Sequence, residues 1–233
     1  MAGRRVLVTG ATRGLGKALV EHWLAAGDEV IGCGRGAAPI THERYSHYVC
    51  DVTDTVAVGA LFSDLKRRAP QLDVLVNNAG IASMNPIALT PVEAARRMLD
   101  TNFLAAFNFT REALRLLRRA SSPRVVNLTT VAVPLRLEGE AVYAASKSAL
   151  ETFTRIAARE MAPLGITCNG VGPCPVETDL TASVPRAKIQ ALIERQAIRR
   201  WGSPQDVINV IDFFVRPESA MVTGQIIYLG GIG

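Results

Sequence analysis

Short β-branched runs alternate with longer amphipathic stretches along the chain, and this alternation limits the possible folds more than any other feature. The spacing predicts helices between buried strands. Strand–helix–strand order favours parallel strands joined by right-handed crossovers, hence a doubly wound sheet with helices on both faces. The predicted strands are Val6–Thr9, Glu29–Cys33, Ser46–Cys50, Val74–Asn77, Arg124–Leu128, Thr167–Val171 and Gln225–Leu229. The predicted helices are Leu15–Ala26, Val56–Arg68, Pro91–Ala120 (which a break near Asp100 could divide), Tyr143–Ala162 and Pro204–Phe214.

No linker, repeat or low-complexity tract interrupts the 233 residues. We therefore predict a single α/β domain over residues 1–233, built on a seven-stranded parallel sheet. One connection is unusually short, because only Gly34–Arg44 separates the second and third predicted strands. That length is barely enough for a helix, so we expect this crossover to be trimmed.

Composition and charge exclude several classes of protein. Hydrophobic residues are 48% and charged residues 20%, which is too apolar for a disordered chain. The apolar runs are too short for a transmembrane helix or a signal peptide, so we expect a cytoplasmic protein with no membrane partner. The net charge of +5 comes from scattered arginines, so we expect no nucleic-acid partner. The four cysteines and three histidines lack ligand spacing, so we predict no disulfide framework and no metal site.

The first predicted strand runs into a glycine-rich turn and a helix start. The turn reads Thr9-Gly10-Ala11-Thr12-Arg13-Gly14-Leu15-Gly16. The first glycine suits a tight turn, the second lets the backbone approach a pyrophosphate, and the third lets the helix pack on the strand. The helix N-terminus then directs its N–H groups at the anion. This pattern predicts a Rossmann-type dinucleotide site at Gly10, Thr12, Arg13, Gly14, Leu15 and Gly16, although a glycine turn without a ligand can share it.

The end of the second predicted strand favours NADP(H) over NAD(H). An NAD site usually places an acid there to accept the ribose 2′-hydroxyl. Here the strand runs into Gly34-Arg35 without an acid. Arg35, together with Arg13 from the first turn, can form charge-assisted hydrogen bonds with a 2′-phosphate. The alternative is that both are ordinary surface arginines of an arginine-rich protein.

Tyr143 and Lys147 are spaced to share one face of a predicted helix. A positive charge at about 4 Å is worth on the order of 4 kcal/mol at an effective dielectric near 20, or roughly three pKa units. Lys147 is therefore expected to lower the pKa of the Tyr143 phenol towards neutrality, so that the phenol can exchange a proton with a substrate oxygen. Taken alone, this spacing is common by chance and can be a surface pair.

With these pieces in family order, the chain resembles the short-chain dehydrogenase/reductase family over nearly its whole length. The further matches are Asp51-Val52, Asn77-Asn78-Ala79-Gly80, Asn102, Thr129-Thr130, Pro173 to Thr178, and Gly230-Gly231. The resemblance implies catalytic roles for Asn102, Thr130, Tyr143 and Lys147. Asn102 would hold the water of a proton relay, and Tyr143 would be the general acid in reduction. It also implies that the cofactor lies against Asp51, Val52, Asn78, Ala79, Gly80, Tyr143, Lys147, Pro173, Val176 and Thr178.

Two positions depart from the family pattern. Thr130 stands where the family has its catalytic serine, and its hydroxyl can still bind a carbonyl oxygen or developing alkoxide. Its methyl group restricts χ1 and narrows the site, so we expect retained activity with a lower rate or altered substrate fit. Cys174 stands where the family usually has glycine. We interpret it as a passive small residue, with a reactive thiol as the alternative.

Within this family, the length and sequence of the stretch from Pro173 to Pro204 most resemble those of 3-oxoacyl-(acyl-carrier-protein) reductases and polyketide ketoreductases. This implies NADPH-dependent reduction of a 3-oxoacyl thioester; the alternatives are a different ketone or secondary alcohol, such as a steroid, sugar or secondary metabolite, and a binding protein without turnover. The partners would be a small-molecule or carrier-protein-tethered substrate and further copies of the chain, as a dimer or tetramer. Candidate contact residues are Arg111, Arg115, Arg118 and Arg119 for an acidic carrier, and Phe103, Phe107, Phe109 and Leu114 for a subunit interface. Leu164 replaces a basic residue that carrier-protein reductases often have.

Overall fold

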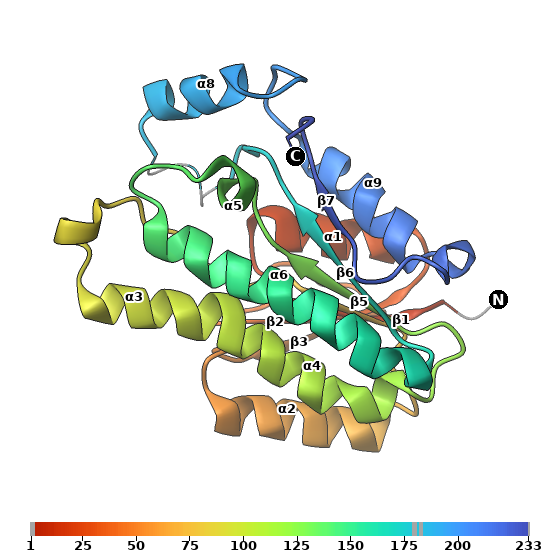
Figure 1. Ribbon diagram of the computed structural model, residues 1–233. Coiled ribbons are helices and arrows are strands. Elements are labelled where there is room, and N and C mark those ends of the chain that lie inside the picture. Colours follow the sequence, from red (N-terminus) through yellow and green to blue (C-terminus); the bar gives the residue numbers. More distant parts are fainter. Residues whose placement is uncertain (1–2, 179–180, 182–183, 233) are drawn as a thin grey trace.

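A seven-stranded, all-parallel sheet forms the centre of one domain (Figure 1). The computed structural model describes residues 3–178, 181 and 184–232. The strand order is β3-β2-β1-β4-β5-β6-β7, which confirms the doubly wound topology expected from the sequence. The strands are β1 (Arg5–Thr9), β2 (Glu29–Gly34), β3 (Tyr45–Val49), β4 (Val74–Asn77), β5 (Arg124–Leu128), β6 (Thr167–Gly172) and β7 (Ile226–Tyr228).

Helices cover both faces of the sheet, and the side chains of β1 alternate between them. Val6 and Val8 pack with α1 (Gly14–Ala25) and α9 (Pro204–Val215), whereas Leu7 packs on the opposite face. That second layer contains α2 (Thr55–Arg68), α4 (Ala105–Leu117) and α6 (Ala141–Met161). Val6, Leu7 and Val8 are all fully buried, which explains why the strand reads as a continuous apolar run.

The predicted long helix over 91–120 is divided near Asp100, as expected. It consists of α3 (Val92–Leu99), a π-helical turn η2 (Asp100–Leu104) and α4. The π-helical turn inserts a residue into the helical ladder and rotates the side chains that follow it. Asn102, a predicted site residue, lies within this turn.

The second crossover is trimmed, as its length predicts. β2 ends at Gly34 and β3 begins at Tyr45, and the described residues between them form no helix. Several short elements had no clear sequence signal. They are η1 (Ile87–Leu89), α5 (Ala132–Leu135), η3 (Ala162–Leu164), α8 (Arg186–Glu194) and η4 (Pro217–Ser219).

The strand order reverses between β1 and β4, and loops from both halves of the sheet meet there at the carboxyl ends of the strands. Ligands of doubly wound sheets bind in the crevice at this switch point. Helix α8 lies at the same end of the molecule, at the top of Figure 1, beyond the loop that follows β6. None of the helices among the described residues is both long enough and apolar enough to span a bilayer.

Candidate active site

A cleft of about 1220 Å³ opens at the carboxyl ends of the strands. The loops that follow the first six strands, β1 to β6, form its walls, together with the start of α6 and one side of α8. Every predicted site residue except Asn102 lines this cleft. These residues are Gly10, Thr12, Arg13, Gly14, Leu15, Gly16, Arg35, Asp51, Val52, Asn78, Ala79, Gly80, Thr130, Tyr143, Lys147, Pro173, Val176 and Thr178.

The glycine loop after β1 has the geometry that a pyrophosphate needs. Gly10 and Gly14 adopt φ values of +67° and +53°, which favour glycine. A Cβ on Gly16 would overlap the Gly10 carbonyl, so only glycine lets α1 approach the strand this closely. Arg13 is the N-cap of α1 with extended backbone, no side chain caps the helix, and its first turn carries no acid. The helix N-terminus therefore suits an anion.

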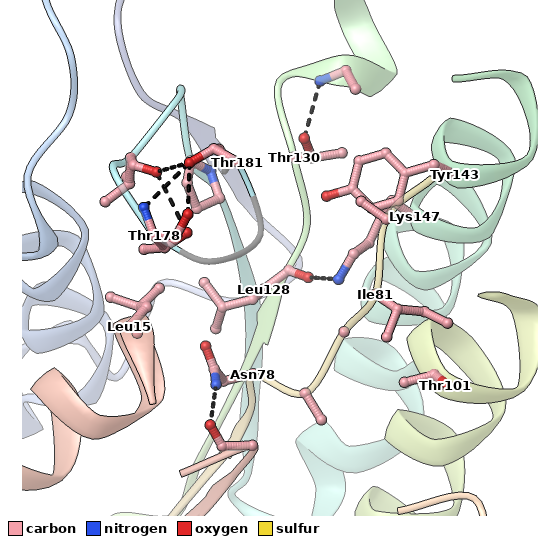
Figure 2. Close-up of a pocket in the computed structure, with 18 of the residues that line it drawn as sticks. Leu15, Asn78, Ile81, Thr101, Leu128, Thr130, Tyr143, Lys147, Thr178 and Thr181 are labelled. Carbon is pink, nitrogen blue, oxygen red and sulfur yellow. Dashed lines mark hydrogen bonds between the residues drawn. The ribbon is translucent and has the colours of Figure 1, made fainter. Parts of the chain in front are cut away.

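Asn78 supports this loop from the neighbouring strand. Its amide nitrogen donates to the carbonyls of Thr9 and Gly10, at 2.9 and 3.2 Å. The Thr9 hydroxyl in turn accepts hydrogen bonds from the backbone N–H groups of Asn78 and Ala79, both at 3.0 Å. The side chain of Asn78 is thus used to fix the glycine loop (Figure 2), a role that its sequence position alone did not reveal.

The opposite end of the cleft contains a carboxylate and a guanidinium. Asp51 Oδ1 accepts hydrogen bonds from the Thr53 N–H and hydroxyl at 2.9 and 2.7 Å. These bonds, and more weakly the charge of Arg35, hold the pKa of Asp51 below its ordinary value. Arg35 is exposed and directly follows Gly34, where β2 ends without an acid. This end can hold an adenine beside Asp51 and an anionic group beside Arg35.

Tyr143, Lys147 and Thr130 meet in the middle of the cleft (Figure 2). Tyr143 and Lys147 are one turn apart on α6, and both are buried. Lys147 Nζ donates to the carbonyl of Leu128 at 2.6 Å. The Thr130 hydroxyl accepts from the N–H of Ala132 at 3.2 Å, which leaves its own proton available for another acceptor.

The electrostatics of this group differ from the sequence-based expectation. Burial raises the pKa of Tyr143 to about 12; the Thr130 hydroxyl opposes this effect and the Glu140 carboxylate adds to it. Burial lowers the pKa of Lys147 to about 8. The expectation that Lys147 brings the Tyr143 pKa towards neutrality is wrong for this arrangement, because the ammonium is directed at Leu128 and burial dominates. The phenol is a proton donor at neutral pH.

Asn102 does not line the cleft, and its side chain is fully engaged by protein. It accepts from the N–H of Ile81 at 2.8 Å and donates to the Ile81 carbonyl and the Ser146 hydroxyl, both at 2.9 Å. Ser146 in turn donates to the Tyr143 carbonyl at 2.7 Å. Asn102 therefore connects the loop after β4 to the helix that carries Tyr143; a role in a water relay stays a prediction.

Gly80 lies between these polar groups. A Cβ placed on it would come within 3.3 Å of both Asn102 Oδ1 and Lys147 Nζ. Glycine at this position keeps the passage beside Lys147 open, which suits a ribose or a nicotinamide ring.

The loop after β6 closes the cleft over the glycine loop. Thr178 lies opposite Gly14, where an added Cβ would meet the Thr178 methyl group at 3.7 Å, and Val176 forms a bridge with Gly202. Thr181, which the sequence did not single out, donates to the Val176 and Thr178 carbonyls, both at 2.9 Å. Cys174 is buried against Gly202, and burial raises the pKa of its thiol. This supports the interpretation of Cys174 as a passive packing residue.

The substrate end of the cleft is lined by residues that sequence reasoning did not identify. They are Ile81, Ala82, Met84, Arg97, Thr101, Leu137, Glu138, Glu140, Val184, Lys188, Leu192 and Arg195. They come from α3, η2, α8 and its C-terminal end, and three loops that only the tertiary structure brings together. No motif marks such positions, because each substrate requires its own set.

A doubly wound sheet with a glycine loop after β1 and a Tyr–Lys pair in the same cleft defines a Rossmann-fold dehydrogenase or reductase. The family model described as enoyl-(acyl carrier protein) reductase matches residues 10–231. The chain belongs to the short-chain dehydrogenase/reductase family, as its motifs indicate. It is an oxidoreductase that acts on CH–OH or C=O groups, and members of this family bind NAD(H) or NADP(H).

Curated relatives and solved structures agree with this assignment. The 3-oxoacyl-(acyl-carrier-protein) reductases FabG of Vibrio harveyi and Escherichia coli are each 30% identical, over 99% and 98% of this chain and 97% and 96% of theirs. Thermoplasma acidophilum aldohexose dehydrogenase superposes with a TM-score of 0.89 at 29% identity, covering 99% of this chain and 94% of that one. An actinorhodin polyketide ketoreductase variant with NADPH gives 0.89 at 28% identity, covering 98% and 96%.

Proposed function

We propose that the protein is an NADPH-dependent reductase that converts a 3-oxoacyl thioester, held on an acyl carrier protein, to the 3-hydroxyacyl thioester. The observation that supports this most directly is the convergence of Tyr143, Lys147 and Thr130 beside Gly80 in the cleft that the glycine loop borders. The similarity to carrier-protein reductases over almost their full length supports the thioester substrate.

The cofactor would lie along the cleft from Arg35 to Tyr143. Gly10, Thr12, Gly14, Leu15 and Gly16 would surround the pyrophosphate at the N-terminus of α1. Arg13 and Arg35 would bind the 2′-phosphate, and Asp51 would accept the adenine amino group next to Val52. Asn78, Ala79, Gly80, Pro173, Val176 and Thr178 would border the ribose and nicotinamide. When bound, the cofactor supplies the hydride that reaches the carbonyl carbon.

The protein's own residues supply the proton and polarise the substrate carbonyl group. The Thr130 hydroxyl donates a hydrogen bond to the substrate carbonyl oxygen as negative charge develops on it. Tyr143 transfers its phenolic proton to that oxygen, so the carbonyl carbon gains a hydride and the oxygen gains a proton. Lys147, one turn further along α6, would hold the nicotinamide ribose of the bound cofactor. The carbonyl of Leu128 keeps the ammonium in place between turnovers.

Two surfaces support the proposed partners. Exposed Arg111, Arg115, Arg118 and Arg119 along α4 and its end could attract an acidic carrier protein. Apolar side chains on α4, η2 and α6 stay exposed and support self-association; Leu104 is 49%, Phe107 41% and Ile156 52% exposed. Phe109, by contrast, is fully buried in the core and is not an interface residue.

The proposal is tested by following NADPH absorbance with acetoacetyl thioesters of pantetheine and of carrier protein, with NADH in parallel. We expect NADPH oxidation well above that of NADH, and almost none for Tyr143→Phe despite intact cofactor binding. Turnover of an aldose or a simple ketone without thioester turnover would replace the substrate assignment with the alternative. Wild-type rates in Tyr143→Phe would overturn the mechanism.

A further inference from the structure

The segment that follows β2 is held to the rest of the molecule by one hydrogen bond and, at its end, by the packing of Ile40 against the core. Residues 35–40 leave the sheet after Gly34 and form no regular element. Among the described residues, they make a single hydrogen bond, in which the Gly36 carbonyl accepts from His47 Nε2 at 2.9 Å. Arg35 and Gly36 line the cleft, and Gly36 lies next to Thr12 of the glycine loop. His47 therefore anchors part of the cleft wall.

Hydrogen-bond chemistry fixes the protonation of this histidine. A carbonyl oxygen only accepts, so His47 Nε2 must carry the proton directed at Gly36. In the neutral ring Nδ1 is then an acceptor, and the Tyr45 hydroxyl lies 2.9 Å from it. Tyr45, His47 and Gly36 thus form a directed chain in which each donor has one acceptor.

Tyr45 is itself held by the sheet. Its hydroxyl packs on Gly32, at a place where a Cβ would overlap it, and its ring packs with the α1–α9 core. Burial raises the pKa of Tyr45 to about 12, so the phenol remains a donor. In the β2–β3 register Gly32 pairs with His47. The fixed phenol orients the imidazole, and the imidazole fixes the segment.

We propose that His47 is a positioning residue that sets the preference for NADPH over NADH. By tethering Gly36 it holds the neighbouring Arg35 at the cleft wall, where the guanidinium would meet the 2′-phosphate. The inference rests on the proposed function in one respect, the assignment of Arg35 to that phosphate. Without the tether, binding the phosphate would first have to order an exposed segment, which weakens NADPH selectively. The affinity for NADH would change little, because the glycine loop holds the pyrophosphate that both cofactors share.

The test measures dissociation constants for NADPH and NADH by cofactor fluorescence, which needs no substrate. His47→Leu should raise the NADPH constant about five- to tenfold, the loss expected for one hydrogen bond and its ordering effect, with less than a twofold change for NADH. His47→Gln, which can still donate from its amide, should recover most of the difference.

His42→Leu is the matched control, since His42 lies in the same crossover and, among the described residues, its hydrogen bonds go to Arg44 and Tyr45 rather than to residues 35–40. Its NADPH-to-NADH ratio should equal that of the wild type. An unchanged ratio in His47→Leu, or an equal loss of both cofactors, would overturn the positioning role while leaving the NADPH assignment standing. A wild type that binds NADPH no more tightly than NADH would overturn both.

Discussion

The hydroxyl of Thr130 occupies a restricted position, because its oxygen accepts a hydrogen bond from the Ala132 N–H and the residue is buried. Thr130→Ser keeps the donor and removes the methyl, so we expect kcat within a few-fold of wild type. Thr130→Val keeps the shape and removes the donor, so kcat should fall about 10²–10³-fold. Steady-state kinetics of the two variants check this. A Val variant as active as the Ser variant would show that the hydroxyl is not used.

The buried ammonium of Lys147 lowers the stability of the folded state. Its ordinary pKa of 10.5 falls to about 8 on burial, so at pH 7 the folded state contains a buried ammonium. We expect Lys147→Met to abolish turnover but to raise the free energy of unfolding at pH 7.

The pH dependence of that gain follows from the same shift. Between pH 8 and 10.5 the unfolded chain binds the lysine proton more tightly than the folded one, so wild-type stability gains from rising pH and the advantage of Lys147→Met shrinks. Urea unfolding of both proteins at pH 7 and pH 10 measures the difference. An advantage that grows with pH would contradict the assignment of a depressed pKa.

At the scale of elements, the N-terminus of α9 is fixed by a reciprocal cap. The Ser203 hydroxyl accepts from the Asp206 N–H at 3.2 Å, and Asp206 Oδ2 accepts from the Ser203 N–H at 2.7 Å. Arg200 pairs with both Asp206 oxygens at 2.8 Å. We expect Ser203→Ala to lower the unfolding free energy by about 1 kcal/mol, as measured by urea titration.

Asp206 adds a pH signature to this cap. Hydrogen bonds from Arg200 and Ser203 hold its pKa well below the ordinary 3.8. A depressed carboxyl pKa stabilises the fold above about pH 3.8, and this contribution is lost as pH falls further. Asp206→Asn should therefore reduce the melting temperature at pH 7, and the gap to wild type should narrow below pH 4. A constant gap at all pH values would contradict the ionic origin of the effect.

At the scale of the whole molecule, the exposed apolar face of α4, η2 and α6 predicts association. We expect light scattering to give a mass of at least twice the 25.0 kDa chain. Phe107→Lys combined with Ile156→Lys should shift this mass towards the monomer, because two charges would be desolvated in the interface. Substitution of Val49, which is exposed on the edge strand β3, with lysine is the matched control and should leave the mass unchanged.

The sequence predicted the architecture because the strand and helix periods are strong along this chain. Parallel order, the trimmed crossover, the glycine loop and the positions of Tyr143 and Lys147 all follow from local patterns. Contacts that depend on register across the sheet did not follow. Three hydrogen bonds of this kind are those of Lys147 to Leu128, Asn78 to Thr9 and Asn102 to Ile81. Each joins residues that are far apart in sequence and become neighbours only in the folded chain.

The residues that line the substrate end of the cleft could not be predicted from the sequence either, for a different reason. Helix α8 has a modest apolar face with only Ile189 and Ile193 buried, so its periodicity is weak. The pKa of Tyr143 depends mainly on burial of the phenol, and the four-residue spacing between Tyr143 and Lys147 does not predict how deeply the phenol is buried.

The crossover after β2, whose residues the structure describes throughout, contains no helix, so its sequence can change without disturbing a regular element. Residues 35–38 are exposed, and the hydrophobic core continues without them, so this stretch can be exchanged or lengthened with little effect on the sheet. With the cofactor placed as proposed, substitutions at these few surface positions would change the preference between NADPH and NADH. The chemistry beside Tyr143 would remain untouched.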